Sequence, residues 1–217
     1  VSRKVKYSAT PAKVVAINAT GMVTPLGDGE ATITATHAGG LKATVKVKVI
    51  EFGVVQPINF GNEIVPIFTK AGCNSGGCHG KSGGQNGFRL SLLGFEPQED
   101  YEYLVKESRG RRLSAAAPEN SLLLLKAAAI LPHGGGGRLD PKSYDWELLV
   151  RWIKQGMQRG SEEDPTVVGL EAYPKQRLVS ANGAQQLTVT AIYSDGHTED
   201  ATHIATYEAN DKEIAEV

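Results

Sequence analysis

The sequence predicts a multidomain protein in which a small, mostly α-helical region lies between two all-β segments of sandwich type. Near both ends of the chain, apolar and polar residues alternate with a period of two, which is typical of half-buried antiparallel strands. From about residue 58 to 162, apolar residues recur at helical spacing between Gly-rich loops. The three regions expected are residues 1–52, 56–164 and 167–217.

The β prediction depends on short alternating runs with turn residues between them. Residues 31–36 and 43–49 alternate in this way, and Gly39 and Gly40 between them predict a hairpin turn. In the last region, residues 185–193 predict a strand, and the Ser-Asp-Gly sequence at 194–196 predicts the turn that follows it.

The two β regions resemble each other. Residues 1–17 align without a gap on residues 201–217, which places Tyr7 on Tyr207 and Ser2 on Thr202. We therefore expect the chain to begin in the middle of one module and to end in the middle of a second copy.

The charges of the two half modules are opposite. Residues 1–50 hold seven basic and two acidic side chains, a charge of +5, whereas residues 167–217 hold three basic and eight acidic ones, a charge of −5. Half modules of opposite charge favour pairing with each other, within one chain or head to tail between chains, and the second arrangement builds a filament. The alternative is that the chain is an excerpt of a longer protein.

Three helices are predicted in the middle region. Apolar residues at helical spacing over 64–71 predict the first, and the segment 121–129 predicts a short one. The third covers residues 143–153, with Ser143 as its N-cap and Gly156 as its stop signal.

Bulk composition excludes some classes of protein. With 41% hydrophobic residues, 22% charged residues and a net charge of −1, the chain is typical of a soluble globular protein and not of a nucleic-acid or membrane-surface binder. No apolar run approaches the roughly 20 residues that span a bilayer, so no membrane span is predicted. No secretory signal peptide is visible at Val1, so an exported protein would carry that segment outside this chain.

Both cysteines of the chain lie in the stretch GCNSGGCHG, residues 72–80. A disulfide is one interpretation, but it leaves His79 without a role, and a zinc site needs about four N or S ligands at paired spacings. The pattern favours covalent attachment of haem, in which Cys73 and Cys78 bond the vinyl groups and His79 ligates the iron. The spacing is two residues longer than the usual C-x-x-C-H, and the small, turn-forming residues 74–77 allow the extra residues to bulge.

Several further stretches resemble a known family. The middle region resembles the planctomycete-type cytochrome c domain on four stretches: PINFGNEIVPIFTKAGCNSGGCHGKSGGQNGFRLSLLGFEPQEDY, GRRLSAAAPENSLLLLK, PHGGGGR and LLVRWIKQG. The flanks resemble the group 2 bacterial Ig-like domain. The resemblance implies a class-I-like cytochrome c fold over 56–164, with the helix before Cys73 crossing the helix that contains Trp152. It also implies that 1–52 and 167–217 are the C-terminal and N-terminal parts of Ig-like modules, and that electrons are transferred outside the cytoplasm.

The second axial ligand of the iron is expected to be His133. It lies between Pro132 and four glycines, on the loop before the last helix, where the resemblance places the distal ligand. Met157 is the alternative. The remaining candidates lie in the outer regions and are expected to be solvated: Met22, His37, His197 and His203.

Other side chains of the middle region are weaker candidates. Arg111, Arg112 and Arg138 are either partners of the haem propionates or solvated. Four apolar residues either wall the haem or simply form core: Phe88, Leu90, Leu92 and Leu125.

These observations predict an electron carrier with one covalent haem c and a low reduction potential, because two His ligands replace the usual His and Met. A filled sixth position argues against enzymatic oxygen chemistry, so an enzyme is not expected. Thioether and disulfide chemistry both indicate the periplasm or cell surface, and the expected partner is a redox protein or a neighbouring haem. The alternatives are a structural or adhesive Ig-like protein with a Cys73–Cys78 disulfide, and the haem domain of a larger oxidoreductase.

Overall fold

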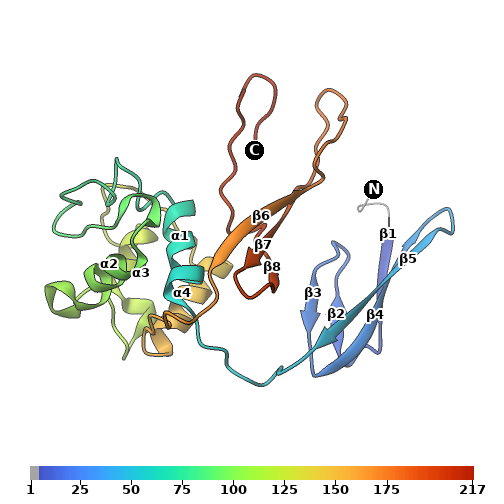
Figure 1. The fold of residues 1–217 in the computed structure, drawn as a ribbon, viewed down its shortest axis with the longest axis horizontal. Coiled ribbons are helices and arrows are strands. Elements are labelled where there is room, and N and C mark those ends of the chain that lie inside the picture. The colour runs from blue at the N-terminus through green and yellow to red at the C-terminus, as the bar shows by residue number, and fades with distance from the viewer. Residues whose placement is uncertain (1–4) are drawn as a thin grey trace. The chain divides into compact units, whose positions relative to one another are not determined.

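A computed structural model of the chain describes residues 5–217 (Figure 1). The chain divides into two compact units, residues 1–56 and 57–217. Positions 1–4 lie outside the described residues, and with them Ser2 of the repeat and Arg3 and Lys4 of the basic charge count.

The fold class that the sequence predicts, a mostly α class-I-like cytochrome c domain between all-β sandwich segments, is wrong. The described residues form a mixed α/β protein with three small antiparallel sheets and few helices. The middle region is not mostly helical because its backbone is interrupted. Leu93, Ser108, Arg109 and Ala129 adopt positive φ angles, and each such residue ends regular helix.

The first unit is built of five strands, β1 (Val5–Thr10), β2 (Val15–Ile17), β3 (Val23–Pro25), β4 (Gly29–His37) and β5 (Lys42–Val49). They form one sheet in the order β1-β4-β5 and a second sheet of β2 and β3 (Figure 1). The predicted hairpin around Gly39 and Gly40 is confirmed, because β4 and β5 pair antiparallel from Thr36 opposite Lys42, and Gly40 has a φ of 82°. The small core of this unit contains Val14, Val15, Ala31 and Ile33.

The third sheet belongs to the second unit and has the order β6-β7-β8. Its strands are β6 (Val167–Tyr173), β7 (Thr188–Tyr193) and β8 (Thr198–Asp200). The strand expected over 185–193 begins three residues late, at Thr188, and the predicted turn that follows is confirmed by the Gly196 N–H, which donates to the Tyr193 carbonyl.

Residues 201–217 form turns and irregular backbone, although the repeat aligns them with β1 and β2. The physical reason lies in strand pairing. β1 is a strand because it pairs along its whole length with β4, and no described strand follows β8 to offer the same partner.

Four short α-helices occur in the described residues: α1 (Val65–Lys70), α2 (Pro97–Tyr101), α3 (Leu122–Ala127) and α4 (Tyr144–Lys154). Short π or 3-10 segments accompany them at Phe60–Ile64, Leu92–Gly94, Glu102–Lys106, Glu107–Gly110 and Pro118–Asn120. The three predicted helices correspond to α1, α3 and α4. The Ser143 hydroxyl accepts from the Trp146 N–H at the start of α4, and Gly156 has a φ of 90° just beyond its end. No helix among the described residues is long and apolar enough to cross a bilayer.

One apolar core joins α1, α4 and the segments between them. Trp152 of α4 is fully buried, its ring lies 5.4 Å from that of Phe60, and its indole N–H donates to the Gln158 carbonyl at 2.8 Å. Phe68 of α1 and Ile64, which ends the π segment before it, contribute to the same core. This packing fixes the C-terminal end of α1, from which the loop with both cysteines departs.

Candidate haem site

The loop that carries the cysteines is closed by its own backbone. The Cys73 N–H donates to the Phe68 carbonyl at the end of α1, and the His79 N–H donates to the Cys73 carbonyl, at 2.8 and 2.9 Å. The two extra residues of the motif are absorbed inside this loop, where the Cys78 N–H donates to the Ser75 carbonyl. Gly80 is required here, because a Cβ at this position would lie 1.9 Å from the Asn74 carbonyl oxygen.

The loop borders a cavity of about 750 Å³, a size found for cofactor pockets. Cys73, Cys78, His79 and His133 all line it. Its apolar lining comes from α1, α3, α4 and the segment after the cysteine loop: Ile67, Phe68, Phe88, Leu90, Leu122, Leu123, Leu139 and Leu149. A largely apolar cavity with a few polar groups is typical of a small-molecule or cofactor site.

The two histidine rings of the cavity are parallel. Their centroids lie 6.2 Å apart, and their planes differ by 6°. With metal–nitrogen bonds of about 2 Å and ring nitrogens about 1 Å from the ring centre, two imidazoles on opposite sides of one metal ion have centroids about 6 Å apart. In distance, the observed separation is compatible with one metal ion between His79 and His133, provided that the Nε2 atom of each ring faces it.

Each ring is oriented by a main-chain carbonyl. Nδ1 of His79 lies 2.9 Å from the Phe88 carbonyl oxygen, and Nδ1 of His133 lies 2.8 Å from that of Gly136. Because a carbonyl only accepts, Nδ1 of each ring carries the hydrogen, and Nε2 of the neutral ring keeps a lone pair. This is the arrangement in which Nε2 ligates a metal.

Burial shifts the pKa values of two side chains in the cavity, His79 and Cys73. Burial lowers the pKa of His79, helped by the neighbouring His133 and opposed by the hydrogen bond to Phe88, so the neutral ring is favoured. Burial raises the pKa of Cys73 to about 11, and the positive charge of Arg138 opposes this shift. Both cysteines are free thiols in the structure. A thiol with so high a pKa is unsuited to act as a thiolate nucleophile at neutral pH.

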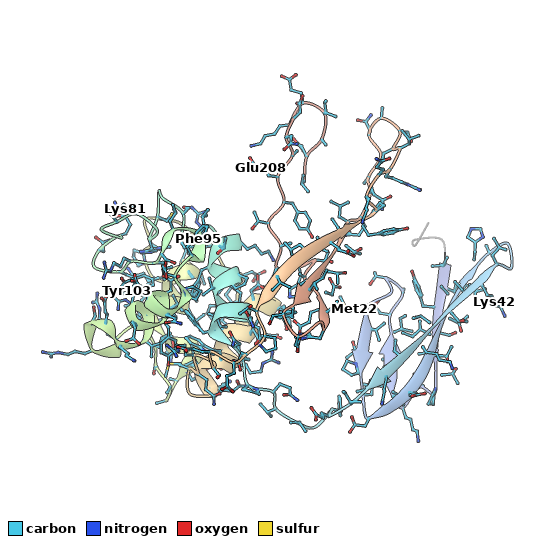
Figure 2. All side chains as sticks on the ribbon, in the orientation of Figure 1. Met22, Lys42, Lys81, Phe95, Tyr103 and Glu208 are labelled. Carbon is cyan, nitrogen blue, oxygen red and sulfur yellow. The ribbon has the colours of Figure 1, made fainter. Side chains whose placement is uncertain are left out.

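The other candidate ligands lie elsewhere. Met22 and His37 belong to the first unit, and Met22, beside β2 and β3, is 66% exposed (Figure 2). His197 stacks on Tyr193 at 4.2 Å, and His203 contacts the ring of Tyr144 edge-on at 5.1 Å.

Met157 packs against the apolar core and does not line the cavity. Its carbonyl accepts from the Tyr101 hydroxyl at 2.6 Å, and its φ of 58° places it in the turn that ends α4. The structure therefore brings His133, and not Met157, to the cavity of His79.

The remaining predicted residues divide between the cavity and other places. Arg111, Arg112 and Arg138 line the cavity, as do Phe88 and Leu90. Leu92 is 52% exposed, and Leu125 is half-buried; neither belongs to the cavity lining. The roles of the Phe88 and Gly136 carbonyls could not be predicted from the sequence, because every residue has a main-chain carbonyl and the residue type does not indicate which one accepts a hydrogen bond.

A second cavity, of about 700 Å³, lies between the α1–α2 region and the third sheet. Asn59, Asp164, Tyr193 and Glu199 are among its lining residues. Hydrogen bonds already join several of these groups, as from Asn59 Nδ2 to Asp164 Oδ2 and from the Tyr193 hydroxyl to Glu199. This cavity contains neither cysteine and neither His79 nor His133.

No known protein family, curated protein or solved structure matches the chain.

Proposed function

We propose that this chain is an electron-transfer protein that carries one covalently bound haem c. Cys73 and Cys78 would hold the haem through thioether bonds, and His79 and His133 would ligate the iron. One observation carries the proposal: two parallel imidazoles, 6.2 Å apart, line the same apolar cavity as both thiols. The donor set fits the group, because His79 and His133 would each supply a ring nitrogen to the iron of a bound haem.

The chemistry of attachment requires only the two thiols. Each Sγ–H adds across one vinyl double bond, so that a carbon–sulfur bond forms while the hydrogen goes to the terminal vinyl carbon. Electrons balance without an external oxidant or reductant. Cys73 and Cys78 both line the cavity, and a bound haem would supply one-electron redox chemistry there.

Two imidazole ligands have consequences for function. They favour a six-coordinate, low-spin iron with a lower reduction potential than a His/Met pair. A filled sixth position supports electron transfer and not oxygen or peroxide chemistry. The partner is accordingly proposed to be a redox protein or a neighbouring haem, and the location to be the periplasm or cell surface, where thioether and disulfide proteins are made.

Pairing of the half modules between chains remains a second part of this proposal. The edge strand β6 exposes Val168, Leu170 and Tyr173, and residues 201–217 repeat the sequence of a region that forms strands elsewhere in the chain. Both features support association of residues 167–217 with the opposite half module of another copy.

The direct test is to produce the chain in a bacterial periplasm that contains thioether-forming machinery, and then to measure its intact mass and visible spectrum. We expect the mass of one haem to be added and a Soret band of a low-spin haem to appear. Cys73→Ser and Cys78→Ser are each expected to reduce covalent loading, whereas Ser75→Ala is expected to retain it. A colourless product whose mass is lower by two hydrogens contradicts the proposal and supports a disulfide.

A further inference from the structure

The charged groups that line the haem cavity are all basic. Arg111, Arg112, Lys126 and Arg138 line it, and no Asp or Glu does among the described residues. The cavity lining is therefore strongly basic, although the chain as a whole has 24 acidic and 23 basic residues. A cavity of this charge favours an anionic ligand, and haem carries two carboxylates.

Two of the four cations are already engaged by the protein. Arg112 is 4% exposed, and its guanidinium donates to the carbonyls of Gly87, Tyr103 and Glu107 at 2.6, 2.7 and 3.1 Å. Lys126 Nζ donates to the Pro132 carbonyl at 2.6 Å. The bonds of Arg112 leave little donor capacity for a ligand. Lys126 keeps two N–H donors, but its bond to Pro132 holds the ammonium beside His133, the residue proposed to face the iron.

Arg138 lies at the cysteine end of the cavity. Its Nη1 is 3.9 Å from the position that a Cβ on Gly72 would take, and among the four cations it alone contributes to the pKa of Cys73. Its Nε donates to the Gly135 carbonyl. In haem the carboxylates extend from the edge away from the vinyl groups, so a cation beside the thioether bonds is poorly placed to bind them.

Arg111 is the remaining cation. Its side chain is exposed, and within residues 5–217 its guanidinium has no acceptor. The buried neighbour Arg112 fixes its backbone at the rim of the cavity. We infer that Arg111 binds a haem carboxylate; this inference rests on the proposed function and adds a positioning residue to it.

An ion pair of this kind has two measurable effects. A positive charge beside the haem disfavours the more positive oxidised state, so removing it lowers the reduction potential. The same charge keeps the pKa of the carboxylate low, and removing it raises that pKa towards the working range. The potential then falls as pH rises through the new pKa. The other charged or titratable groups that line the cavity are Arg112, Lys126, Arg138, His79, His133 and the thiols Cys73 and Cys78, which the proposed thioether bonds would remove from titration.

The test measures the midpoint potential of the haem-loaded protein between about pH 5 and pH 8. We expect Arg111→Gln to lower the potential and to introduce a fall with rising pH, and Arg111→Lys to restore most of the wild-type profile. Arg138→Gln is the matched control, because it removes one charge from the same cavity and is expected to add no pH dependence.

The outcomes separate the two proposals. Wild-type protein that carries covalent haem with a bis-His spectrum supports the proposed function. If, in addition, the midpoint potentials of Arg111→Gln and Arg138→Gln depend on pH in the same way, the inference about Arg111 is wrong and the proposed function stands. If wild-type protein takes up no covalent haem, the proposed function fails, and the inference fails with it.

Discussion

Each histidine of the site depends on a main-chain carbonyl for its orientation. The Phe88 and Gly136 carbonyls fix the tautomers of His79 and His133, and this sets which nitrogen is available to a metal. Such partners are insensitive to the identity of the residue that supplies them, provided that its backbone conformation is kept. The ligands themselves should be the sensitive positions.

The first prediction concerns His133. We expect His133→Ala to convert the six-coordinate, low-spin spectrum to a high-spin one and to allow carbon monoxide to bind the reduced protein, because the sixth position becomes open. Visible absorption spectra of both redox states measure this. His203→Ala, which removes a histidine that does not line the cavity, is expected to leave the spectrum unchanged. A low-spin spectrum in His133→Ala that disappears when Met157→Leu is added would identify Met157 as the ligand.

A second prediction concerns Arg112, whose role is in the fold. We expect Arg112→Gln to lower the free energy of unfolding by about 2 kcal/mol, because the main-chain carbonyls of Gly87, Tyr103 and Glu107 lose the charged donor that this buried side chain supplies. Urea denaturation measures the effect. Arg111→Gln, which removes the exposed neighbouring charge, is expected to change stability by less than about 0.5 kcal/mol. Equal effects of the two substitutions would contradict the assignment of Arg112 to the fold.

At the scale of elements, what was predictable from the sequence depended on strong local signals. Helix α4 was predictable because three signals indicate the same helix: its apolar face, the N-cap Ser143 and Gly156 just beyond its C-terminal end. The hairpin of β4 and β5 was predictable for the same reason. The segment from α2 to residue 113 was not predictable, because Ser108 and Arg109 adopt left-handed backbone conformations that these two residue types do not favour.

The site shows a similar division. The cysteine motif directly indicated Cys73, Cys78 and His79, while the pairing of His133 with His79 depends on a loop whose path only tertiary structure fixes. The role of Arg112 was equally hidden, since a buried arginine and a solvated one look alike in sequence.

The third prediction tests the helical core. We expect Trp152→Ala to cost about 3–5 kcal/mol of unfolding free energy, because a fully buried indole is replaced by a cavity. Trp152→Phe keeps most of the volume but loses the hydrogen bond to the Gln158 carbonyl, so a smaller loss is expected. Thermal or urea denaturation separates the two. An alanine variant as stable as the phenylalanine variant would show that indole packing does not hold α4.

A fourth prediction uses Glu63, a partly buried carboxyl group in the π segment before α1. Burial raises its pKa, the N–H of Asn59 opposes the shift at 2.7 Å, and the like charge of Glu199 adds to it. A carboxyl group whose pKa is higher in the folded protein than in the unfolded chain stabilises the fold at pH values below the unfolded pKa, which is about 4.5 here. This contribution to stability is lost as the pH rises through the folded pKa.

We therefore expect Glu63→Gln, which keeps an oxygen acceptor for Asn59, to reduce the loss of stability between about pH 4 and pH 7. Urea midpoints across that range measure it, with Glu162→Gln as the exposed control. A wild-type pH profile in Glu63→Gln would contradict a raised pKa at this position.

At the scale of the whole molecule, the net charge of −1 conceals two opposite charges of +5 and −5 on the terminal regions. In the first unit, Lys42, Lys46 and Lys48 all lie on β5, an edge strand. Lysines on an edge strand oppose pairing between two identical edges. They do not oppose an acidic partner, so the same residues favour association between unlike half modules.

The last prediction concerns association between copies of the chain. If residues 167–217 of one copy pair with residues 1–50 of another, self-association should be stronger at about 50 mM salt than at about 500 mM, because exposed charges are screened over shorter distances at high salt. Sedimentation velocity over a range of protein concentrations measures it.

Lys46→Glu combined with Lys48→Glu is expected to weaken the association, because it lowers the charge of residues 1–50 from +5 to +1 and so weakens their attraction to the acidic residues 167–217. Exchanging the same two lysines for arginine keeps the charge and should preserve it. Association that grows with salt would instead indicate apolar contact through the exposed side chains of β6. A single monomeric species at every salt and protein concentration would contradict pairing between copies. It would not contradict haem binding, because every proposed ligand of the haem lies within residues 73–133 of one chain.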